Sequence, residues 1–443
     1  MGIGRAGARR DRSCKGCAVR VLVIGSGGRE SALTWALARS PSVTNVFAAP
    51  GNPGIARLAE VLDMDAGAPA AAVEAARSVN ADLVIVGPEA PLVAGVGDAL
   101  RHDGFKVFGP DAGAARIEGS KAYARELMDR GGVPSARWQV FDEVDKAVGF
   151  MDELGPPYVV KADGLAAGKG VLVAADRDEA VEAIRDRIER RAFGESGAKV
   201  VIEEFLDGEE ASLIAFTDGT AVVGCEVAQD YKRAFDDDAG PNTGGMGSYS
   251  PVPSCPRPIA ELILSTIIEP MVRTTAEAGA PFVGALYAGL ALTSRGPRVV
   301  EFNARFGDPE TQALLPRLQS DFGEVVMATA MGDLAGSRLE WSPRPCVSVV
   351  LASEGYPGPH ETGLEIDGLE EAESSDDVVV FHAGTARRGD RVVTAGGRVL
   401  AVSALGDDFV AARECAYEAT NKITFDGKHQ RFDIGLRAAE RSS

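Results

Sequence analysis

The first part of the chain alternates short apolar runs with segments of helical spacing, and several of the apolar runs end in glycine. The runs 19–24, 81–86 and 105–108 are each followed by a glycine, and after the first of them Leu33 and Leu37 stand at a helical interval. This alternation predicts a parallel, doubly wound sheet. Ligands of such sheets bind at the carboxyl ends of the strands, so we expect the loops after these three runs to border one cleft.

Length and composition are those of an ordinary globular protein. With 443 residues, 45% of them hydrophobic, the chain is long enough for roughly two to four domains. No stretch approaches the roughly 20 apolar residues that span a bilayer, so we expect no membrane association. The net charge of −19 excludes a general nucleic-acid binder, which would carry a basic face. It does not exclude an ATP site, because phosphates need only a few local cations and backbone N–H groups.

The cysteines and the N-terminal segment bear on location in the cell. Four of the six cysteines are scattered singly, as in a reduced cytosolic protein, and we expect a cytoplasmic location. Cys14 and Cys17 are spaced like a metal-binding pair, but no second pair or nearby histidine completes a zinc site. They fall within residues 1–18, a basic, Gly-rich segment that we expect to be a disordered extension. A start codon assigned too early and an organelle transit peptide are the alternatives.

Beyond the first sheet the pattern changes to helices mixed with paired strands. Further helices are expected over residues 120–130, 178–190, 259–278, 307–318 and 407–421, the last of them closing the chain. Further strands are expected over residues 138–141, 158–161, 171–174, 200–205, 211–217, 221–227, 286–293, 298–303, 347–352, 378–383, 391–394 and 399–404. A Gly-rich loop is expected over 236–247.

The loop after the first strand, GSGGRE at 25–30, partly matches a dinucleotide-binding fingerprint. Glu30 replaces its third glycine, and the second strand ends without the acidic residue that would hold a ribose, so a nicotinamide cofactor is disfavoured. The glycines still allow backbone N–H groups to approach a phosphate at a helix start, and Arg29 would add charge there. The alternative is an ordinary tight turn.

Residues 161–170, KADGLAAGKG, lack the spacing and the Ser/Thr of a Walker A loop. The segment lies between two predicted strands, so it can fold over a triphosphate as a flexible cover. Lys161 and Lys121 would supply cations to the phosphates. An ordinary turn is the alternative.

The strand predicted over 200–205 carries Glu203 and Glu204 near its end, followed by Leu206 and Glu210. Backbone groups at such a strand end can read the edge of an adenine, and a carboxylate can hold ribose hydroxyls. Alone, the pattern is equally that of a solvated acidic turn.

The run VVEFNARFGDPE at 299–310 places two oxygen-bearing side chains on one strand. Because strand side chains alternate in direction, Glu301 and Asn303 are expected on one face. Val300 and Phe302 are expected to face the core. Two oxygen ligands on one face suit Mg²⁺, which completes its shell with water and phosphate. The alternative is a buried polar pair.

Residues 229–233, QDYKR, precede an almost side-chain-free loop, GPNTGGMG at 240–247. Charged residues beside such a loop fit a pocket for a very small substrate, and a flexible surface loop is the alternative. Arg305, shortly after the oxygen ligands, would contact a phosphoryl group in transfer.

Taken in order, these motifs resemble the glycinamide ribonucleotide synthetase family of the ATP-grasp superfamily. The resemblance extends from Val19 to Arg437 and is carried by residues 25–30, 87–91, 161–170, 229–233, 240–251, 301–310 and 431–437. It implies a multidomain α/β and α+β fold. Its parts would be a Rossmann-like N-terminal domain over 19–119, an ATP-grasp core over 120–137 and 209–340, an inserted lid over 138–208, and a small mixed C-terminal domain over 341–443.

The same resemblance implies roles for individual residues. ATP would be held by Lys121, Lys161, Gly164, Gly168, Lys169, Gly170, Glu203, Glu204, Leu206 and Glu210, and a divalent metal by Glu301 and Asn303. The phosphoribosylamine cleft would be lined by Gly27, Gly28, Arg29, Asn52 and Glu89. Glycine and the transferred phosphate would meet at Asp230, Lys232, Gly244, Gly245 and Met246, bordered by Arg305 and Asp308. Lys161, Asp230 and Arg305 would be catalytic. Two positions depart from the family pattern, which usually has histidine at both: Ser31 and Tyr231.

The activity implied by the resemblance is ATP-dependent ligation of glycine to 5-phosphoribosylamine through glycyl phosphate, with Mg²⁺ or Mn²⁺. The products would be glycinamide ribonucleotide, ADP and phosphate, in purine biosynthesis, and the enzyme would be a monomer or a weak dimer. A carboxylase of aminoimidazole ribonucleotide, another ATP-grasp enzyme, is the nearest alternative. An NAD-dependent dehydrogenase is disfavoured by the incomplete fingerprint. A non-catalytic nucleotide-binding protein is disfavoured because metal, phosphate and lid residues are all present.

Overall fold

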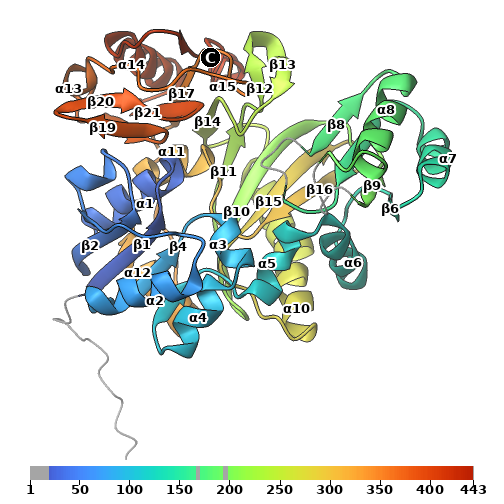
Figure 1. Ribbon diagram of the computed structural model, residues 1–443, viewed down its shortest axis with the longest axis horizontal. Coiled ribbons are helices and arrows are strands. Elements are labelled where there is room, and N and C mark those ends of the chain that lie inside the picture. The colour runs from blue at the N-terminus through green and yellow to red at the C-terminus, as the bar shows by residue number, and fades with distance from the viewer. Residues whose placement is uncertain (1–18, 166–169, 193–197, 443) are drawn as a thin grey trace, which may run out of the picture.

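The computed structural model describes residues 19–165, 170–192 and 198–442 (Figure 1). A five-stranded, a four-stranded and a nine-stranded sheet organise the chain. In Figure 1 the N-terminal sheet, in blue, lies below the C-terminal strands, in orange and red, and the four-stranded unit projects at the right. No helix in the described ranges is long and apolar enough to cross a membrane.

The N-terminal sheet is parallel, with strand order β3-β2-β1-β4-β5. Its strands are β1 (Val19–Gly25), β2 (Val43–Pro50), β3 (Glu60–Val61), β4 (Leu83–Val86) and β5 (Lys106–Phe108). Between and after them lie α1 (Gly28–Ala38), α2 (Pro69–Ser78), α3 (Glu89–Val93), α4 (Val96–His102) and α5 (Ala112–Gly119). Val21 and Val23 pack in one core while Leu22 and Ile24 pack in another, so both faces of β1 are buried. This confirms the doubly wound sheet, whose central strands must be apolar on both faces.

The four-stranded unit is antiparallel, with order β6-β9-β7-β8. It comprises β6 (Trp138–Phe141), α7 (Val144–Leu154), β7 (Tyr158–Ala162), β8 (Val171–Ala174), α8 (Arg177–Ile188) and β9 (Val200–Glu203). Ala147, Met151, Val160 and Ile184 form part of a hydrophobic core that is confined to this unit. A separate core allows the unit to move as one body.

The large sheet runs without interruption from the middle of the chain into its C-terminal part. Its order is β16-β15-β10-β11-β14-β17-β21-β18, with β22 beside β17. These strands are β10 (Glu209–Asp218), β11 (Val222–Asp230), β14 (Gly247–Ser250), β15 (Val283–Thr293), β16 (Gly296–Asn303), β17 (Cys346–Ser353), β18 (Val378–His382), β21 (Arg398–Leu405) and β22 (Lys428–His429). The expected pairings of β10 with β11 and of β15 with β16 are present. Because β14 pairs with β17, the boundary proposed near residue 341 separates two halves of one sheet.

The remaining helices surround this sheet. They are α6 (Lys121–Gly131), α9 (Arg257–Ile263), α10 (Glu269–Glu277), α11 (Glu310–Leu314), α12 (Phe322–Met331), α13 (Leu369–Ala372), α14 (Phe409–Lys422) and α15 (Leu436–Ser442). The helix expected over 259–278 is divided by a π-helical turn, Leu264–Ile268. Pro270 follows that turn and has no N–H to donate to the preceding one, which accounts for the irregularity.

Two expectations for this region were wrong. The segment 236–247, expected to be a loop, contains β13 (Ala239–Asn242), which pairs with β12 (Arg233–Phe235). Arg431, far along the chain, donates from Nη1 to the Arg233 carbonyl and to Asp238, and so supports this hairpin. The helix expected to close the chain, α14, is followed by β22 and α15.

Candidate active site

A cavity of about 800 Å³ lies where the N-terminal sheet, the four-stranded unit and the large sheet meet. Most residues predicted for binding or catalysis line it, namely Arg29, Glu89, Lys121, Lys161, Gly164, Gly170, Glu203, Glu204, Leu206, Glu210, Asp230, Lys232, Gly244, Glu301, Asn303, Arg305 and Asp308. The segments that follow β1 and β4 border this one cavity, as predicted. The loop after β5 does not, because its Gly109 packs against Gly284 of β15.

The other predicted residues have different positions. Gly27, Gly28, Asn52, Gly245 and Met246 are not part of the cavity lining. Gly168 and Lys169 fall outside the described residues. The roles expected for these seven residues remain predictions.

Glu203 and Lys161 form a buried charged cluster with Arg125 of helix α6. Arg125 donates to both carboxylate oxygens of Glu203, at 2.8 and 2.6 Å, and Lys161 Nζ lies 2.7 Å from the same carboxylate. Although burial opposes it, Arg125 and Lys161 hold the pKa of Glu203 below its ordinary value. The carboxylate of Glu203 is therefore bonded within the protein.

Lys161 is held close to the predicted metal ligands. Its Nζ donates to the carbonyl of Val300, the residue before Glu301, at 3.0 Å. Burial lowers the pKa of Lys161, while Glu203 opposes that shift. A desolvated lysine fixed between two strands is a pre-positioned cation for phosphate oxygens.

Helix α6 and the glycine-rich segment are joined by side-chain contacts. Ser120 caps α6 by accepting from the Tyr123 N–H at 3.2 Å, and its hydroxyl donates to Asp163 at 3.1 Å. Lys121 Nζ donates to the Gly164 carbonyl at 3.0 Å. Lys121 therefore lies at the base of the glycine-rich segment, where the sequence predicted a phosphate site.

Strand β16 presents Glu301 and Asn303 to the cavity, but the expectation for Val300 was wrong. The ladder pairs Val299 with Leu290 and Glu301 with Gly289, so Val300 is an unpaired bulge residue. A bulge shifts the alternation of side chains by one position. Val299 is consequently buried in the core, whereas the half-buried Val300 lines the cavity. Phe302 is buried as expected and also borders the cavity.

Positive charge surrounds this pair of oxygen donors. Although burial opposes it, Lys232, Lys161 and other nearby cations hold the pKa of Glu301 below its ordinary value. Within the described residues no side-chain hydrogen bond of Glu301 or Asn303 is present, and so both side chains can coordinate an ion. An ionised carboxylate and an amide oxygen on one strand are donors that a hard divalent cation accepts.

Lys232 and Asp230 line the same cavity, at the end of strand β11. Lys232 forms an ion pair with Glu210, and despite burial the surrounding carboxylates raise its pKa well above the ordinary value. Burial raises the pKa of Asp230 to about 7, with Lys232 opposing and neighbouring carboxylates reinforcing the shift. The expected catalytic carboxylate therefore titrates near neutrality.

Glu30 organises the first loop from inside. Its carboxylate accepts from the Gly27 N–H at 2.7 Å and from Arg29 Nε at 2.6 Å. Side chains on Gly25 or Gly87 would collide with Glu30, because added Cβ atoms would lie 2.6 and 2.2 Å from it. Glu30 thus stands at the position of the third fingerprint glycine, and the loop folds around its carboxylate.

Among the residues that the structure describes, the Asn52 side chain bonds only to backbone groups. Its amide nitrogen donates to the carbonyls of Ser26 and His382, at 2.8 and 2.9 Å, and its oxygen accepts from Gly54 and Ile55. In this structure it joins the first loop to strand β18.

Arg305 and Asp308 are both fixed by ionic contacts. Arg305 donates to Glu89 at 3.2 Å and to Glu118 at 2.7 Å. Asp308 accepts from the Arg29 N–H at 3.3 Å and lies 3.4 Å from Arg398 Nη1. These contacts tie the end of β16 to the N-terminal sheet and place the two residues between the predicted substrate positions.

The two departures from the family pattern are accommodated by the C-terminal part of the chain. The Ser31 hydroxyl accepts from the His382 N–H at 3.2 Å. The Tyr231 hydroxyl accepts from the Gly435 N–H at 2.9 Å, and Arg431 stacks over its ring. Neither residue introduces a charge into the cavity.

Sequence analysis missed several polar residues that the fold brings to the cavity, among them Glu118, Arg125, Tyr287 and Arg398. Single charged residues on helices and strand ends resemble ordinary surface residues, so Glu118, Arg125 and Arg398 carried no local signal. Tyr287 pairs with Asn303 across the β15–β16 ladder, and its hydroxyl donates to Glu310 at 2.8 Å. Knowledge of the β15–β16 register would have placed Tyr287 beside Asn303, and so in the cavity.

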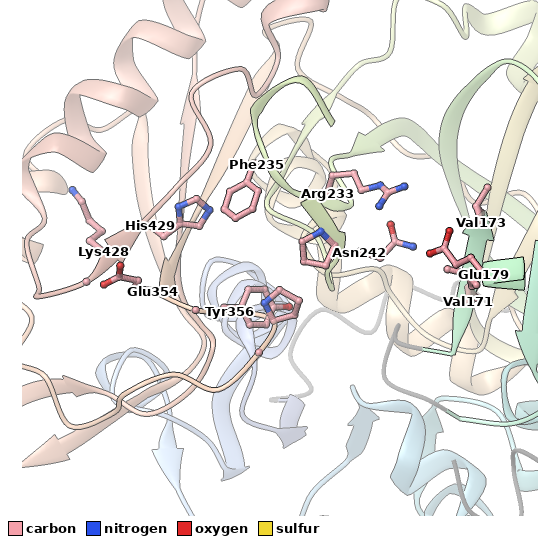
Figure 2. Close-up of a pocket in the computed structure, with 16 residues that line it drawn as sticks. Val171, Val173, Glu179, Arg233, Phe235, Asn242, Glu354, Tyr356, Lys428 and His429 are labelled. Carbon is pink, nitrogen blue, oxygen red and sulfur yellow. The ribbon is translucent and has the colours of Figure 1, made fainter. Parts of the chain in front are cut away.

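A more open hollow of about 1180 Å³ lies beside this cavity, and Figure 2 shows the side chains that line it. Val171, Val173 and Glu179 form one wall, and Arg233 and Asn242 face them across the gap. All of these except Glu179 also line the first cavity, so the two spaces are continuous. The hollow is the mouth between the four-stranded unit and the C-terminal part of the chain.

Almost the whole chain matches the domains of one known protein family. Residues 19–118 match the N domain of phosphoribosylglycinamide synthetase, residues 119–311 its ATP-grasp (A) domain, and residues 346–437 its C domain.

Individual relatives agree with this assignment. Proteins named phosphoribosylamine–glycine ligase from Pseudomonas aeruginosa and Streptomyces coelicolor are each 50% identical, over 96% and 95% of this chain and 99% and 100% of their own lengths. The crystal structure of phosphoribosylamine–glycine ligase from Thermotoga maritima is 34% identical and superposes with a TM-score of 0.81, covering 94% of this chain and all of the other. The chain belongs to the phosphoribosylglycinamide synthetase family.

Proposed function

We propose that this protein joins glycine to 5-phosphoribosylamine using ATP, and yields glycinamide ribonucleotide, ADP and phosphate in purine biosynthesis. One observation carries the proposal: Glu301 and Asn303 face a single cavity together with Lys161, Lys232 and the Arg29 loop. Relatives at 50% identity carry the name of this activity, which supports the choice of substrates.

The reaction requires activation of a carboxylate, which is a poor electrophile. An oxygen of the glycine carboxylate attacks the γ-phosphorus of ATP, ADP leaves, and glycyl phosphate forms. The amine of phosphoribosylamine then attacks the carbonyl carbon, and phosphate leaves with the electron pair of the broken C–O bond. Phosphoryl transfer depends mainly on positioning and charge neutralisation. We assign that role to Lys161 and Arg305, because each is fixed beside the end of β16 by partners of opposite charge.

The amine must lose a proton during the second step. Asp230 is the candidate acceptor, because it lines the cavity and its pKa of about 7 suits a base that works near neutral pH. Lys232, two residues away on the same wall, would compensate the charge of the carboxylate or of the transferred phosphate.

Glu301 and Asn303 are the residues that would hold a divalent ion. When bound there, the ion would withdraw negative charge from the triphosphate. We propose Mg²⁺ as this ion, and the same oxygen donors would accept Mn²⁺.

Glycyl phosphate is hydrolysed by water, so the cavity must close during turnover. We propose that residues 138–208 act as a lid that closes over the nucleotide. The separate hydrophobic core of this unit supports such a movement, and Lys161, Gly164 and Gly170 on its inner side reach the cavity. The other domains proposed are 19–119, the core at 120–137 with 209–340, and 341–443.

We propose that the enzyme acts in the cytoplasm as a monomer or a weak dimer. The scattered single cysteines, as in a reduced cytosolic protein, support the proposed location.

The proposal is tested by phosphate release with ATP, glycine and freshly prepared phosphoribosylamine, each omitted in turn. Release should require all three, and bicarbonate should not replace glycine. Glu301→Ala should lower the rate by roughly 1,000-fold, because charge stabilisation of the transferring group is lost. Glu277→Ala, which changes an exposed residue of α10, is the matched control and should leave the rate unchanged. Near-normal activity of a folded Glu301→Ala protein would remove Glu301 from the metal site, and release without glycine would reject the ligase assignment.

A further inference from the structure

Arg398 reaches the active-site cavity from the C-terminal half of the large sheet. It is the first residue of β21 and pairs with Ala352 of β17, whereas Lys121, Lys161, Lys232 and Arg305 come from earlier parts of the chain. The cavity lining includes Arg398 beside Gly244, Asp308 and Tyr356. The guanidinium therefore stands where the Gly-rich segment and the end of β16 meet.

One nitrogen of Arg398 fixes these two segments. Nη1 donates to the carbonyls of Gly244 and Asp308, at 2.6 and 2.8 Å, and lies 3.4 Å from the Asp308 carboxylate. The guanidinium rests against Gly244, where an added Cβ would lie 3.0 Å from its central carbon. Tyr356, also from the C-terminal part, accepts from the Gly244 N–H at 3.0 Å. Glycine at position 244 thus gives the guanidinium room to lie flat against the backbone.

The rest of the guanidinium is available to a ligand. Across the described residues the side-chain hydrogen bonds of Arg398 all start from Nη1, and the side chain remains 22% exposed. Arg305 differs, because its Nε, Nη1 and Nη2 all donate to protein oxygens. Lys161 Nζ likewise already contacts protein groups, the Glu203 carboxylate and the Val300 carbonyl. Among these three cations Arg398 has the largest unused donor capacity.

Its acidic partner is shared with other donors. Asp308 also accepts from the Gln312 amide at 2.8 Å and from the Arg29 N–H. An arginine whose Nε and Nη2 are unpaired in a cavity matches the two oxygens of a carboxylate or phosphate.

We propose that Arg398 binds the oxyanion of a substrate, through Nε and Nη2, while Nη1 holds the Gly244 and Asp308 backbone in place. This inference rests on the proposed function, in which two substrates carry such a group: glycine as a carboxylate and phosphoribosylamine as a phosphate. Arg398 is a substrate-binding residue in this assignment, and it contributes no proton to the reaction.

The test measures KM and kcat of Arg398→Met and Arg398→Lys for each substrate in turn, together with binding of glycinamide ribonucleotide by calorimetry. Loss of a charge-assisted contact should raise one KM by about 10- to 100-fold, with the KM for ATP unchanged. Lysine should restore part of the affinity. If the phosphate is the ligand, the KM for phosphoribosylamine rises and the product, which keeps the phosphate but has no free carboxylate, binds more weakly. If the carboxylate is the ligand, only the KM for glycine rises.

A structural role alone would give a different result. If Arg398 only holds the Gly244 and Asp308 backbone in place, its substitution would lower kcat or the melting temperature and leave the KM values for glycine and phosphoribosylamine unchanged. That outcome overturns the proposal. Arg388→Met is the matched control, since Arg388 is an arginine of the same region that is 60% exposed and paired with Glu365. The wild-type protein is assayed in parallel. A wild type without ligase activity rejects the proposed function, whereas an active wild type with unaltered variants rejects only the role of Arg398.

Discussion

Glu203 illustrates at the scale of one residue why an acidic side chain near a nucleotide site need not contact the nucleotide. Its carboxylate is buried and bonded to Arg125 and Lys161, and both cations also donate to the carbonyl of Val300. The cluster joins helix α6, strands β7 and β9 of the four-stranded unit and strand β16. It therefore holds together elements that border the cavity.

Arg125→Met should destabilise the protein strongly. The change leaves a buried carboxylate with one cation and removes two bonds to backbone carbonyls, and breaking a buried pair in this way lowers the free energy of unfolding by about 3–5 kcal/mol. Denaturant unfolding measures the effect. Arg177→Met is the control, because Arg177 pairs with Asp152 at the surface and such pairs contribute little. Equal melting temperatures for the two variants would contradict the structural role of the cluster.

The sequence predicted many of the residues near the motifs that line the cavity, but it did not predict the groups to which their side chains bond. The pattern at 203–210 indicated an acidic strand end, and the structure places Glu204, Leu206 and Glu210 in the cavity lining as expected. That Glu203 is bonded within the protein depends on Arg125, which is distant in sequence and carries no motif. Pairing of this kind is decided by packing of helices against sheets, which local spacing does not reveal.

At the scale of elements, the active site depends on irregular backbone at the junctions of strands. The bulge at Val300 turns that residue toward the cavity and keeps Glu301 and Asn303 on the same side. Gly208, between β9 of the four-stranded unit and β10 of the large sheet, has φ +99° and lies against strand β15. This short connection sets the position of one sheet relative to the other.

Gly208→Ala should lower the free energy of unfolding by distorting the connection between β9 and β10. A Cβ there would lie 2.2 Å from the Leu292 carbonyl oxygen, so the backbone must shift, and we expect a loss of about 2 kcal/mol in unfolding free energy. The shift should also weaken ATP binding, because Gly208 lines the cavity. Gly332→Ala is the control: φ is +74°, nothing lies within 4 Å of its added Cβ, and only the conformational cost of about 1 kcal/mol applies. Thermal unfolding and ATP titration of both variants measure the difference, and equal effects would contradict the steric argument.

At the scale of the whole molecule, the C-terminal strands complete both the sheet and the site. Strand β17 continues the sheet beyond β14, and β18 brings His382 beside the N-terminal loop. His382 is 1% exposed, and its Nδ1 bonds Thr385 at 3.0 Å. Burial, with help from Arg57 and Arg387, lowers the pKa of His382 to about 4.

This buried histidine predicts a loss of stability in acid. Between pH 6.5 and about 4 the unfolded chain binds a proton at His382 and the folded chain does not, so stability falls as the pH decreases. The full effect is about 3 kcal/mol of unfolding free energy. His382→Gln should flatten this part of the stability–pH profile, measured by denaturant unfolding at several pH values. His102→Gln, at an exposed position, should leave the profile unchanged, and a profile of His382→Gln parallel to that of the wild type would contradict the prediction.

The sequence by itself determined the family, the doubly wound first sheet and the chemistry of the main motifs, because each is encoded by residues close together in the chain. Spacing placed Glu301 and Asn303 on one face of a strand. Only the tertiary structure decided which polar groups bond to one another and which remain available to ligands. Strand register and helix packing between distant segments produce the bulge at Val300, the burial of Glu203 and the position of Arg398 in the cavity. No local sequence pattern specifies them.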